Sequence, residues 1–337
     1  MLSIMKAYKR YISLFLFGIG ISCQSLQDLE AQRHTGRALG TTYSIQYQGS
    51  ATDYENNQKA FDSIFQMLNH SMSTYWPQSI ITRINEGMDT VTVDNHFKKV
   101  FHKATEIWTA TSGLFDPTVG SLVNAYGFGP VKGLKTLNNQ QIDSLLELTG
   151  WHKIQLTKKG KIHKLNPRIR LDFNAIAKGY TVDVIANFLT SKGCQNFLVE
   201  IGGEIVARGI SPKSQKPWTI AIDDPQQQKQ RTFQTTVALN NAALATSGNY
   251  RKFRIDSLTG KKYVHTLNPK TGRPVRSNIL STSVRASDCM TADAWATALM
   301  VLPLKKGQLL VEKNPDIEAF WIVAHNKETV EVRSSRW

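Results

Sequence analysis

Two oxygen-bearing residues, Asp293 and Thr297, stand four positions apart on an alanine-rich segment with a helical pattern. This spacing places both side chains on one helix face, and the small neighbouring residues leave room for a ligand. Carboxylate and hydroxyl oxygens suit Mg²⁺, which keeps several waters and usually bridges carboxylates to substrate phosphates. A helix N-terminal acid beside a buried threonine explains the same pair, so the spacing alone leaves both interpretations open.

Lys178 falls in the first turn of a predicted helix that follows the predicted strand 169–173. A cation at that position faces the positive end of the helix dipole. The arrangement becomes favourable when an anion binds there, because free backbone N–H groups and the lysine then hold it together. A solvent-exposed lysine that tolerates a small penalty is the alternative.

Three further segments carry groups suited to a phosphorylated or flat ligand. Thr246 and Ser247 precede a glycine, and their hydroxyls suit either a phosphate or the cap of a turn. His265 lies on a predicted strand, where a single histidine is more often structural than catalytic. Asp116 stands among the aromatic residues and glycines of segment 113–129, which favours a flat ligand or a packed loop.

Irregularly alternating strand and helix patterns supply the elements that must position these residues. Residues 42–47 alternate as in a strand, and helical spacing marks 61–68 and 97–108, the latter with Asp94 as N-cap and Gly113 as stop. This alternation predicts an α+β fold, without the phosphate-binding motifs of doubly wound nucleotide-binding folds. Further strands are predicted at 169–173, 197–206, 218–222, 235–239 and 263–267, and further helices after 173, ending near 193, and over 291–302.

The N-terminal segment has the features of an export signal. Basic residues within 6–10 precede the mostly apolar run 11–21, which is too short to span a bilayer stably. Ser22 and Cys23 end this run as in a bacterial lipobox, although Gly20 stands where leucine is usual. A plain secretory signal with an incidental cysteine is the alternative.

We therefore expect residues 1–22 to be a lipoprotein-type signal peptide and Cys23 to be lipidated. Residues 23–35 are mostly polar and are predicted to be a linker, and 36–337 are predicted to form a single folding unit. No later segment is apolar enough to cross a membrane, so we expect an exported protein, anchored at one end and facing the periplasm or the cell exterior.

Charge and cysteine content narrow the classes of partner. The net charge of +15 suits anionic partners, but the lysines and arginines are scattered, which argues against nucleic acid and leaves a phosphorylated ligand or an anionic membrane. Besides Cys23, the chain contains Cys194 and Cys289, which suit buried thiols or one disulfide. No cysteine or histidine spacing indicates zinc.

In their order along the chain, these segments resemble the ApbE family, the FAD:protein FMN transferases. The resemblance covers most of the chain that follows the predicted linker. Its matching blocks are Leu39 to Tyr43, Ser73-Thr74-Tyr75 with Ser79 and Asn85, Phe115 to Gly120 with Gly127 to Gly129, Ala175 to Tyr180 with Asp183, Ile201 to Ile205, Thr246 to Tyr250, His265 to Pro274, and Ala292 to Thr297.

The resemblance implies a T-fold-like, two-lobed single unit with the FAD and magnesium site between the lobes. Three departures accompany it: Leu39 replaces a usual methionine, Asn268 a frequent aspartate and Asn174 a frequent glycine. By resemblance, Mg²⁺ is bound by the backbone carbonyl of Ala175 and the side chains of Asp293 and Thr297, while FAD is contacted by Leu39, Ser73, Thr74, Tyr75, Asp116 and Lys178, with Thr246, Ser247 and His265 nearby.

The implied reaction is phosphoryl-type transfer. Mg²⁺ and Lys178 neutralise the FAD pyrophosphate while an acceptor serine or threonine hydroxyl attacks the FMN phosphorus and AMP leaves. His265 is the candidate proton acceptor, with Asp116 or a metal-bound water as alternatives. The family implies acceptors among flavin-carrying subunits of respiratory complexes, of the sodium-pumping NADH-quinone reductase or Rnf type. Hydrolysis of FAD at the same site and mere flavin binding are the competing functions.

Overall fold

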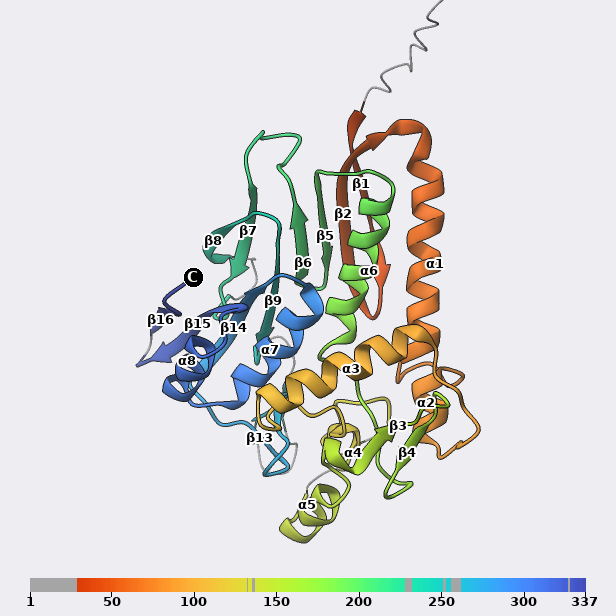
Figure 1. Cartoon of the computed structure of the whole chain (residues 1–337). Coiled ribbons are helices and arrows are strands. Elements are labelled where there is room, and N and C mark those ends of the chain that lie inside the picture. The colour runs from red at the N-terminus through yellow and green to blue at the C-terminus, as the bar shows by residue number, and fades with distance from the viewer. Residues whose placement is uncertain are drawn as a thin grey trace, which may run out of the picture.

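An eight-stranded sheet, in the order β1-β2-β5-β6-β9-β14-β15-β16, forms the centre of the molecule (Figure 1). All its neighbouring strands are antiparallel. The structure is a computed structural model that describes residues 29–131, 133–134, 137–227, 232–250, 253–255, 262–326 and 328–337. The predicted signal peptide and Cys23 lie outside the described residues.

The strands of this sheet are β1 (Leu29–Ala38), β2 (Thr41–Ser50), β5 (Phe197–Ile201), β6 (Glu204–Arg208), β9 (Ala242–Gly248), β14 (Ile279–Ala286), β15 (Ile317–His325) and β16 (Glu328–Arg333). Shorter strands form separate antiparallel pairs. They are β3 (Ile154–Leu156) with β4 (Ile162–Lys164), β7 (Trp218–Asp223) with β8 (Phe233–Leu239), β10 (Phe253–Ile255) with β11 (Lys262–Val264), and β12 (Leu267–Asn268) with β13 (Arg273–Pro274).

Helices cover one face of the sheet, where α6 packs on β5 and β6 and α7 packs on β9 and β14 (Figure 1). Helices α2, α4 and α5 lie with the β3–β4 hairpin below the sheet in this view. The helices are α1 (Tyr54–Met72), α2 (Ile80–Asn85), α3 (Asn95–Ala110), α4 (Gly120–Ala125), α5 (Asn139–Leu146), α6 (Ala177–Ser191), α7 (Cys289–Val301) and α8 (Leu304–Glu312).

Strand alternation divides the apolar side chains of β5 and β6 between two cores. Val199 and Val206 are buried in the main cluster beneath the helices. Ile205 and Ala207 instead pack with Trp218 in a second cluster, against the β7–β8 hairpin on the other face. The sheet is therefore covered on both faces at this point, which holds the start of β6 in place.

The α+β prediction is confirmed.

Several predicted elements are confirmed. The strand at 42–47 belongs to β2, and α3 has the predicted N-cap, since Asp94 accepts the Phe97 N–H at 2.7 Å, a contact worth about 1 kcal/mol. Helix α6 ends just before Gly193, whose φ is +81°. Helix α7 ends at Val301, ahead of Pro303.

Other boundaries were predicted wrongly. The predicted linker 23–35 overlaps β1, which begins at Leu29 and pairs along its length with β2. This edge strand buries only His34 fully, so its polar composition matched that of a linker. The single strand predicted at 197–206 is two strands, because Gly202 and Gly203 turn the chain with φ of +64° and +103°.

Three more local predictions need correction. Residues 169–173 form no strand: Arg170 makes one isolated bridge, and Leu171 pairs with a side chain instead. The strand predicted at 263–267 is interrupted, and His265 lies between β11 and β12. Thr246 and Ser247 lie within β9 and cap no turn.

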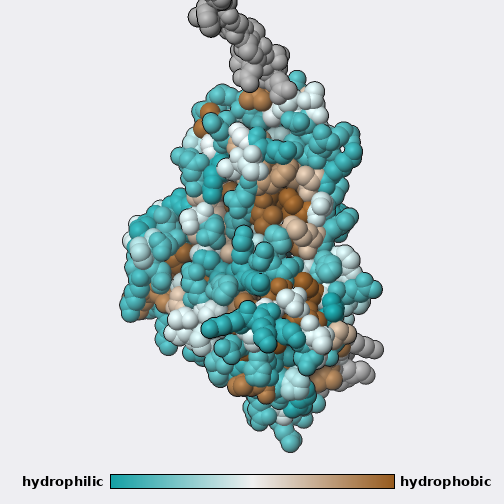
Figure 2. Space-filling view, turned by 45° about the vertical axis from the view of Figure 1, so that its right-hand side comes forward, coloured by the Kyte–Doolittle hydropathy of each residue, from teal (hydrophilic) through white to brown (hydrophobic). Residues whose placement is uncertain are grey.

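Figure 2 shows a face that is largely hydrophilic, with hydrophobic residues gathered in smaller areas. Among the helices of the described residues, none has the length and apolar content needed to span a bilayer.

Candidate active site

Lys178 in the first turn of α6 lies between two buried carboxylates. Its Nζ is 2.7 Å from Glu204 Oε1 and 3.8 Å from Asp293 Oδ2. The lysine side chain is 30% exposed, whereas both carboxylate side chains are 4% exposed. Asp293 lies beyond hydrogen-bond length from the lysine, so its buried carboxylate gains from a further cation.

The N-terminal ends of α6 and α7 cross in close contact at this group. The Gly179 N–H donates to Asp293 Oδ2 at 3.1 Å. A Cβ on Gly179 would lie 2.3 Å from the Cys289 carbonyl oxygen, so only glycine fits the crossing. Asp183, one turn further along α6, accepts the Cys289 and Met290 N–H groups, each at 2.8 Å. These bonds fix Lys178 relative to Asp293.

The three predicted magnesium ligands gather around this crossing. The Gly179 N–H would donate to the Ala175 carbonyl if the helix began earlier, but it donates to Asp293 instead. The Ala175 carbonyl is thus outside the α6 ladder of hydrogen bonds. Thr297 follows Asp293 by one turn of α7, and its Oγ1 lies 3.1 Å from Ser247 Oγ. Carbonyl, carboxylate and hydroxyl oxygens are the donors that Mg²⁺ prefers.

The electrostatic surroundings keep Lys178 charged. Burial by itself lowers the pKa of Lys178, but Asp293 and Glu204 outweigh it and leave that pKa above its ordinary value. Burial raises the pKa of Asp293, against the opposing effect of Lys178. A cation close to Asp293 would therefore stabilise its charged form.

Thr246 on strand β9 and Leu39 in the β1–β2 turn lie next to this group. Thr246 Oγ1 is 2.7 Å from Ser283 Oγ on the neighbouring strand β14. Leu39, with a φ of +51°, forms the β1–β2 turn. Gly202 donates to the Thr42 carbonyl at 3.0 Å, so the β1–β2 turn lies beside the turn that precedes Glu204.

Asp116 occupies a hydrogen-bonded pocket of its own. Its Oδ1 accepts the N–H of Thr118 at 2.9 Å and the hydroxyl of the same residue at 2.5 Å. Its Oδ2 accepts Trp108 Nε1–H at 3.1 Å and the Trp151 N–H at 2.9 Å. Burial raises the pKa of Asp116, and the bonds from Thr118 act against it. Both carboxylate oxygens are thus engaged by the protein.

The Ser73–Tyr75 segment and His265 come together around Phe128. Tyr75 is 59% exposed and donates its hydroxyl to the Phe128 carbonyl at 3.2 Å. The rings of Phe128 and His265 lie edge to face, 6.3 Å apart. Ser73 accepts the Tyr75 N–H at 3.3 Å, and the Thr74 hydroxyl oxygen is buried without a hydrogen-bond partner among the described residues.

Two hydrogen bonds, one between backbone groups and one between side chains, connect segments that carry these groups. Asp172 donates its N–H to the Pro117 carbonyl at 2.8 Å, which ties the Asp116 loop to the segment before Ala175. The Thr266 hydroxyl donates to Asn249 Oδ1 at 2.7 Å, which ties the chain beside His265 to the end of β9. Each of these two bonds thus joins two segments that are separate in the sequence and that carry predicted site residues.

Sequence reasoning assigned no role to Glu204 or to Asn85. The Asn85 side chain pairs with both backbone groups of Leu171, at 2.8 and 2.6 Å, and so shapes the approach to Ala175. Neither contact follows from periodicity, because the partners are far apart along the chain. For Glu204, the preceding pair of glycines was the available signal of a tight turn.

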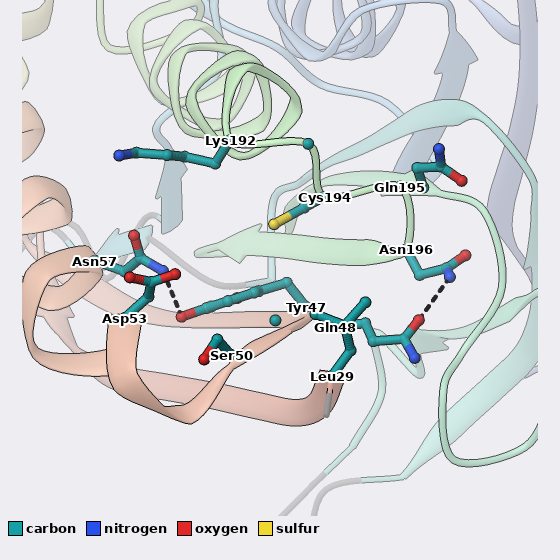
Figure 3. A pocket seen from close by; sticks show the side chains of 12 residues that line it. Leu29, Tyr47, Gln48, Ser50, Asp53, Asn57, Lys192, Cys194, Gln195 and Asn196 are labelled. Atoms are coloured by element: carbon teal, nitrogen blue, oxygen red, sulfur yellow. Dashed lines mark hydrogen bonds between the residues drawn. The ribbon is translucent and has the colours of Figure 1, made fainter. Parts of the chain in front are cut away.

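A cavity of about 380 Å³ lies at the opposite end of α6 (Figure 3). Tyr47, Asn57, Lys192 and Cys194 line it, and it contains none of the predicted site residues. Burial raises the pKa of Cys194, which disfavours its reactive thiolate. Cys194 is a free thiol, as is Cys289, so the predicted alternative of a disulfide between them is wrong.

Within the described ranges, no cluster of three or more histidine, cysteine, aspartate or glutamate side chains is placed to hold a metal. This finding leaves the sparser donor set at the α6–α7 crossing, which combines one carboxylate with hydroxyl and carbonyl oxygens.

Comparisons with known proteins agree with this geometry. The family model described as "ApbE family" matches residues 39–321. The FAD:protein FMN transferase of Haemophilus influenzae is 36% identical over 290 residues, 83% of each chain. That of Vibrio cholerae is 36% identical over 286 residues, 83% of this chain and 84% of the relative.

Solved structures give the same result. The flavin transferase ApbE of Vibrio cholerae has a TM-score of 0.82 at 33% identity, covering 91% of this chain and 98% of its own. The apo flavinyl transferase ApbE of Pseudomonas stutzeri has a TM-score of 0.80 at 30% identity, covering 92% and 96%. Sequence, fold and site arrangement thus lead to one conclusion: the chain belongs to the ApbE family.

Proposed function

We propose that this chain transfers the FMN moiety of FAD to a serine or threonine hydroxyl of an acceptor flavoprotein and releases AMP. Membership of the ApbE family and the likeness to FAD:protein FMN transferases support this reaction. The observation that carries the proposal at the level of the site is the buried Asp293 carboxylate, which accepts one backbone N–H and lies 3.8 Å from Lys178.

The residues around the α6–α7 crossing fit a magnesium ion. Asp293 and Thr297 supply side-chain oxygens, and Ala175 supplies a carbonyl outside the helix ladder. Mg²⁺ is usually held by one or two carboxylates and keeps several waters, which agrees with this sparse donor set. When bound, the ion supplies neutralisation of the charge on the transferred phosphoryl group.

The chain's own residues orient and neutralise the pyrophosphate of FAD. Lys178, in the first turn of α6, attracts it by its positive charge. The acceptor oxygen forms a bond to the FMN phosphorus, and the bond from that phosphorus to the bridging oxygen breaks. The bonding electrons leave with AMP, and the hydroxyl proton passes to a base, for which His265 is our candidate. The four bonds to Asp116 support a positioning role for its loop.

We further propose that the enzyme works outside the cytoplasm. The basic start, the apolar run and Cys23 support export with a lipid anchor, facing the periplasm or the cell exterior. Flavin-carrying subunits of respiratory complexes, of the sodium-pumping NADH-quinone reductase or Rnf type, are the proposed acceptors. Support for these acceptors comes from the family resemblance alone.

One incubation tests the reaction. The purified protein is mixed with FAD, Mg²⁺ and an FMN-accepting domain, and the mass of the acceptor and the soluble products are measured. We expect the mass of FMN on the acceptor, with an equal amount of AMP. Free FMN and AMP without acceptor label would identify a pyrophosphatase, and intact FAD would identify a flavin-binding protein.

Two controls test the proposed metal site. EDTA should abolish transfer, and added Mg²⁺ should restore it. Asp293→Ala should abolish both transfer and any FAD cleavage, since it removes the one carboxylate of the donor set. Unchanged rates in that variant would show that the metal lies elsewhere.

A further inference from the structure

We propose that Glu204 positions the Lys178 ammonium away from Asp293, so that the Asp293 carboxylate stays available to a divalent cation. This inference rests on the proposed function, because the cation is the magnesium ion proposed above. Glu204 would then be a positioning residue that sets metal affinity without touching the metal or the substrate.

The distances show which carboxylate engages the lysine. At 2.7 Å, the contact of Lys178 Nζ with Glu204 Oε1 has the length of a strong charge-assisted hydrogen bond. At 3.8 Å, its contact with Asp293 Oδ2 is beyond hydrogen-bond length. The lysine is therefore bound to Glu204 and only near Asp293.

Asp293 is held in place without the lysine. The Gly179 N–H donates to its Oδ2 at 3.1 Å, which fixes the carboxylate against the first turn of α6. If Glu204 lost its charge, the nearest carboxylate left for the Lys178 ammonium would be Asp293. A partly buried ammonium gains from a close partner, so the lysine would close on Asp293 and compete with the metal.

Glu204 is placed rigidly enough for this role. It is the first residue of β6 and pairs with Ile201 across a two-glycine turn. Gly202 donates to Thr42 at 3.0 Å, and Gly203 donates to Glu200 Oε1 at 2.7 Å. These bonds hold the backbone of the turn before Glu204, so a change of partner requires movement of the long Lys178 side chain rather than of the hairpin.

The test uses the single variants Glu204→Gln and Lys178→Met and the double variant. Mn²⁺ binding is titrated by electron paramagnetic resonance, with and without FAD. We expect Glu204→Gln to weaken Mn²⁺ binding about tenfold or more when Lys178 is present, and less than about threefold in the Lys178→Met background. Equal losses in both backgrounds would reveal a simple charge effect and overturn the inference.

The same titration separates this inference from the proposed function. A wild-type protein that binds no Mn²⁺ even with FAD overturns the magnesium site and the inference together. Wild-type binding with no loss in Glu204→Gln overturns only the role of Glu204.

Two further readouts exclude a merely structural effect. Glu204→Gln should raise the Mg²⁺ concentration for half-maximal transfer, with kcat recovering at saturating Mg²⁺, whereas a disordered site would lower kcat at every concentration. Glu204→Asp, which keeps the charge and shortens the reach, should give an intermediate loss. Thermal unfolding followed by circular dichroism verifies that each variant is folded, and a kcat that fails to recover in folded Glu204→Gln contradicts the proposal.

Discussion

Asp293 and Asp116 are both buried aspartates, 3% and 7% exposed, and burial raises the pKa of each. Their surroundings differ. Asp116 accepts four hydrogen bonds from the protein, close to the full capacity of a carboxylate. Asp293 accepts one backbone N–H and has Lys178 at 3.8 Å. Both aspartates are thus buried, but they differ in how many hydrogen bonds the protein donates to them. Asp293 keeps the capacity to bind a ligand, and Asp116 does not.

The charge balance follows the same division. The donors around Asp116 are neutral groups that complete a buried site. Around Asp293, the second carboxylate of Glu204 binds the lysine at 2.7 Å, and the lysine stays 3.8 Å from Asp293. Natural proteins keep such loosely paired charges at functional sites, where a ligand completes the pairing. Mutating the two aspartates should therefore affect different properties.

The largest expected effect is on activity, in Asp293→Asn. We expect FMN transfer to fall by about a thousandfold or more, because the variant loses the only carboxylate of the proposed metal site. Without metal, its free energy of unfolding should stay within about 1 kcal/mol of the wild type or rise, since the variant removes a buried charge whose lysine partner is 3.8 Å away. Transfer rates and urea unfolding in EDTA measure both. A large loss of stability with transfer retained would reverse the assignment.

Next in size is the loss of stability in Asp116→Asn. The amide nitrogen would face two of the four donors, so we expect the free energy of unfolding to fall by about 2–4 kcal/mol. Asp143→Asn on the exposed side of α5 is the matched control and should change it by less than about 0.5 kcal/mol. If Asp116→Asn unfolds like the wild type but transfers no FMN, this carboxylate acts on the substrate and the comparison fails.

The parts of this arrangement that sequence predicted are those within one element. The four-residue spacing placed Asp293 and Thr297 on one face of α7, and the helix start placed Lys178 in the first turn of α6. Periodicity has no information on which distant carboxylate a lysine meets. The pairing of Lys178 with Glu204 depends on how α6 packs on β6, and it became visible only in the structure.

The elements that were predicted wrongly from the sequence have a similar explanation. A polar edge strand such as β1 buries few side chains, so its composition does not distinguish it from a linker. The backbone near Leu171 is satisfied by the Asn85 side chain rather than by a neighbouring strand, and local patterns do not specify such a partner. The site was recognisable because family motifs, unlike periodicity, record contacts between distant segments.

Asp183 is an intermediate case, since its carboxylate accepts two backbone N–H groups at the start of α7. Burial raises its pKa to about 7, above the ordinary value of about 4. Between these values the folded protein holds a proton that the unfolded chain releases, so stability falls as the pH rises from about 4 to about 7. This rise in pKa corresponds to about 4 kcal/mol at most, and we expect this contribution to be about 2–4 kcal/mol.

Asp183→Asn should remove that pH dependence. Urea unfolding of the variant and the wild type at several pH values between 4 and 8 measures the difference between their free energies of unfolding. This difference should change between pH 4 and pH 7 by the expected contribution of Asp183. If the difference in free energy of unfolding stays constant, Asp183 has the same pKa in the folded and the unfolded protein. Its two backbone N–H donors would then offset the effect of burial.

The smallest expected effect concerns Ser247, which contacts the threonine of the proposed metal site. Its Oγ lies 3.1 Å from Thr297 Oγ1 and limits the rotation of that hydroxyl. Ser247→Ala should lower Mg²⁺ affinity a few-fold, because outer contacts of this kind orient metal ligands, and should lower the free energy of unfolding by about 0.5–1.5 kcal/mol. Calorimetric Mg²⁺ titration with FAD present measures the affinity. Ser334→Ala, which removes a buried hydroxyl that accepts the Ala319 N–H at 3.0 Å near the C-terminus, is the control. It should lower stability by a similar amount and leave Mg²⁺ affinity unchanged. If both variants lose Mg²⁺ affinity equally, metal binding responds to the general stability of the protein rather than to the orientation of Thr297. The free hydrogen-bonding capacity of Asp293 would then not explain why the metal binds there.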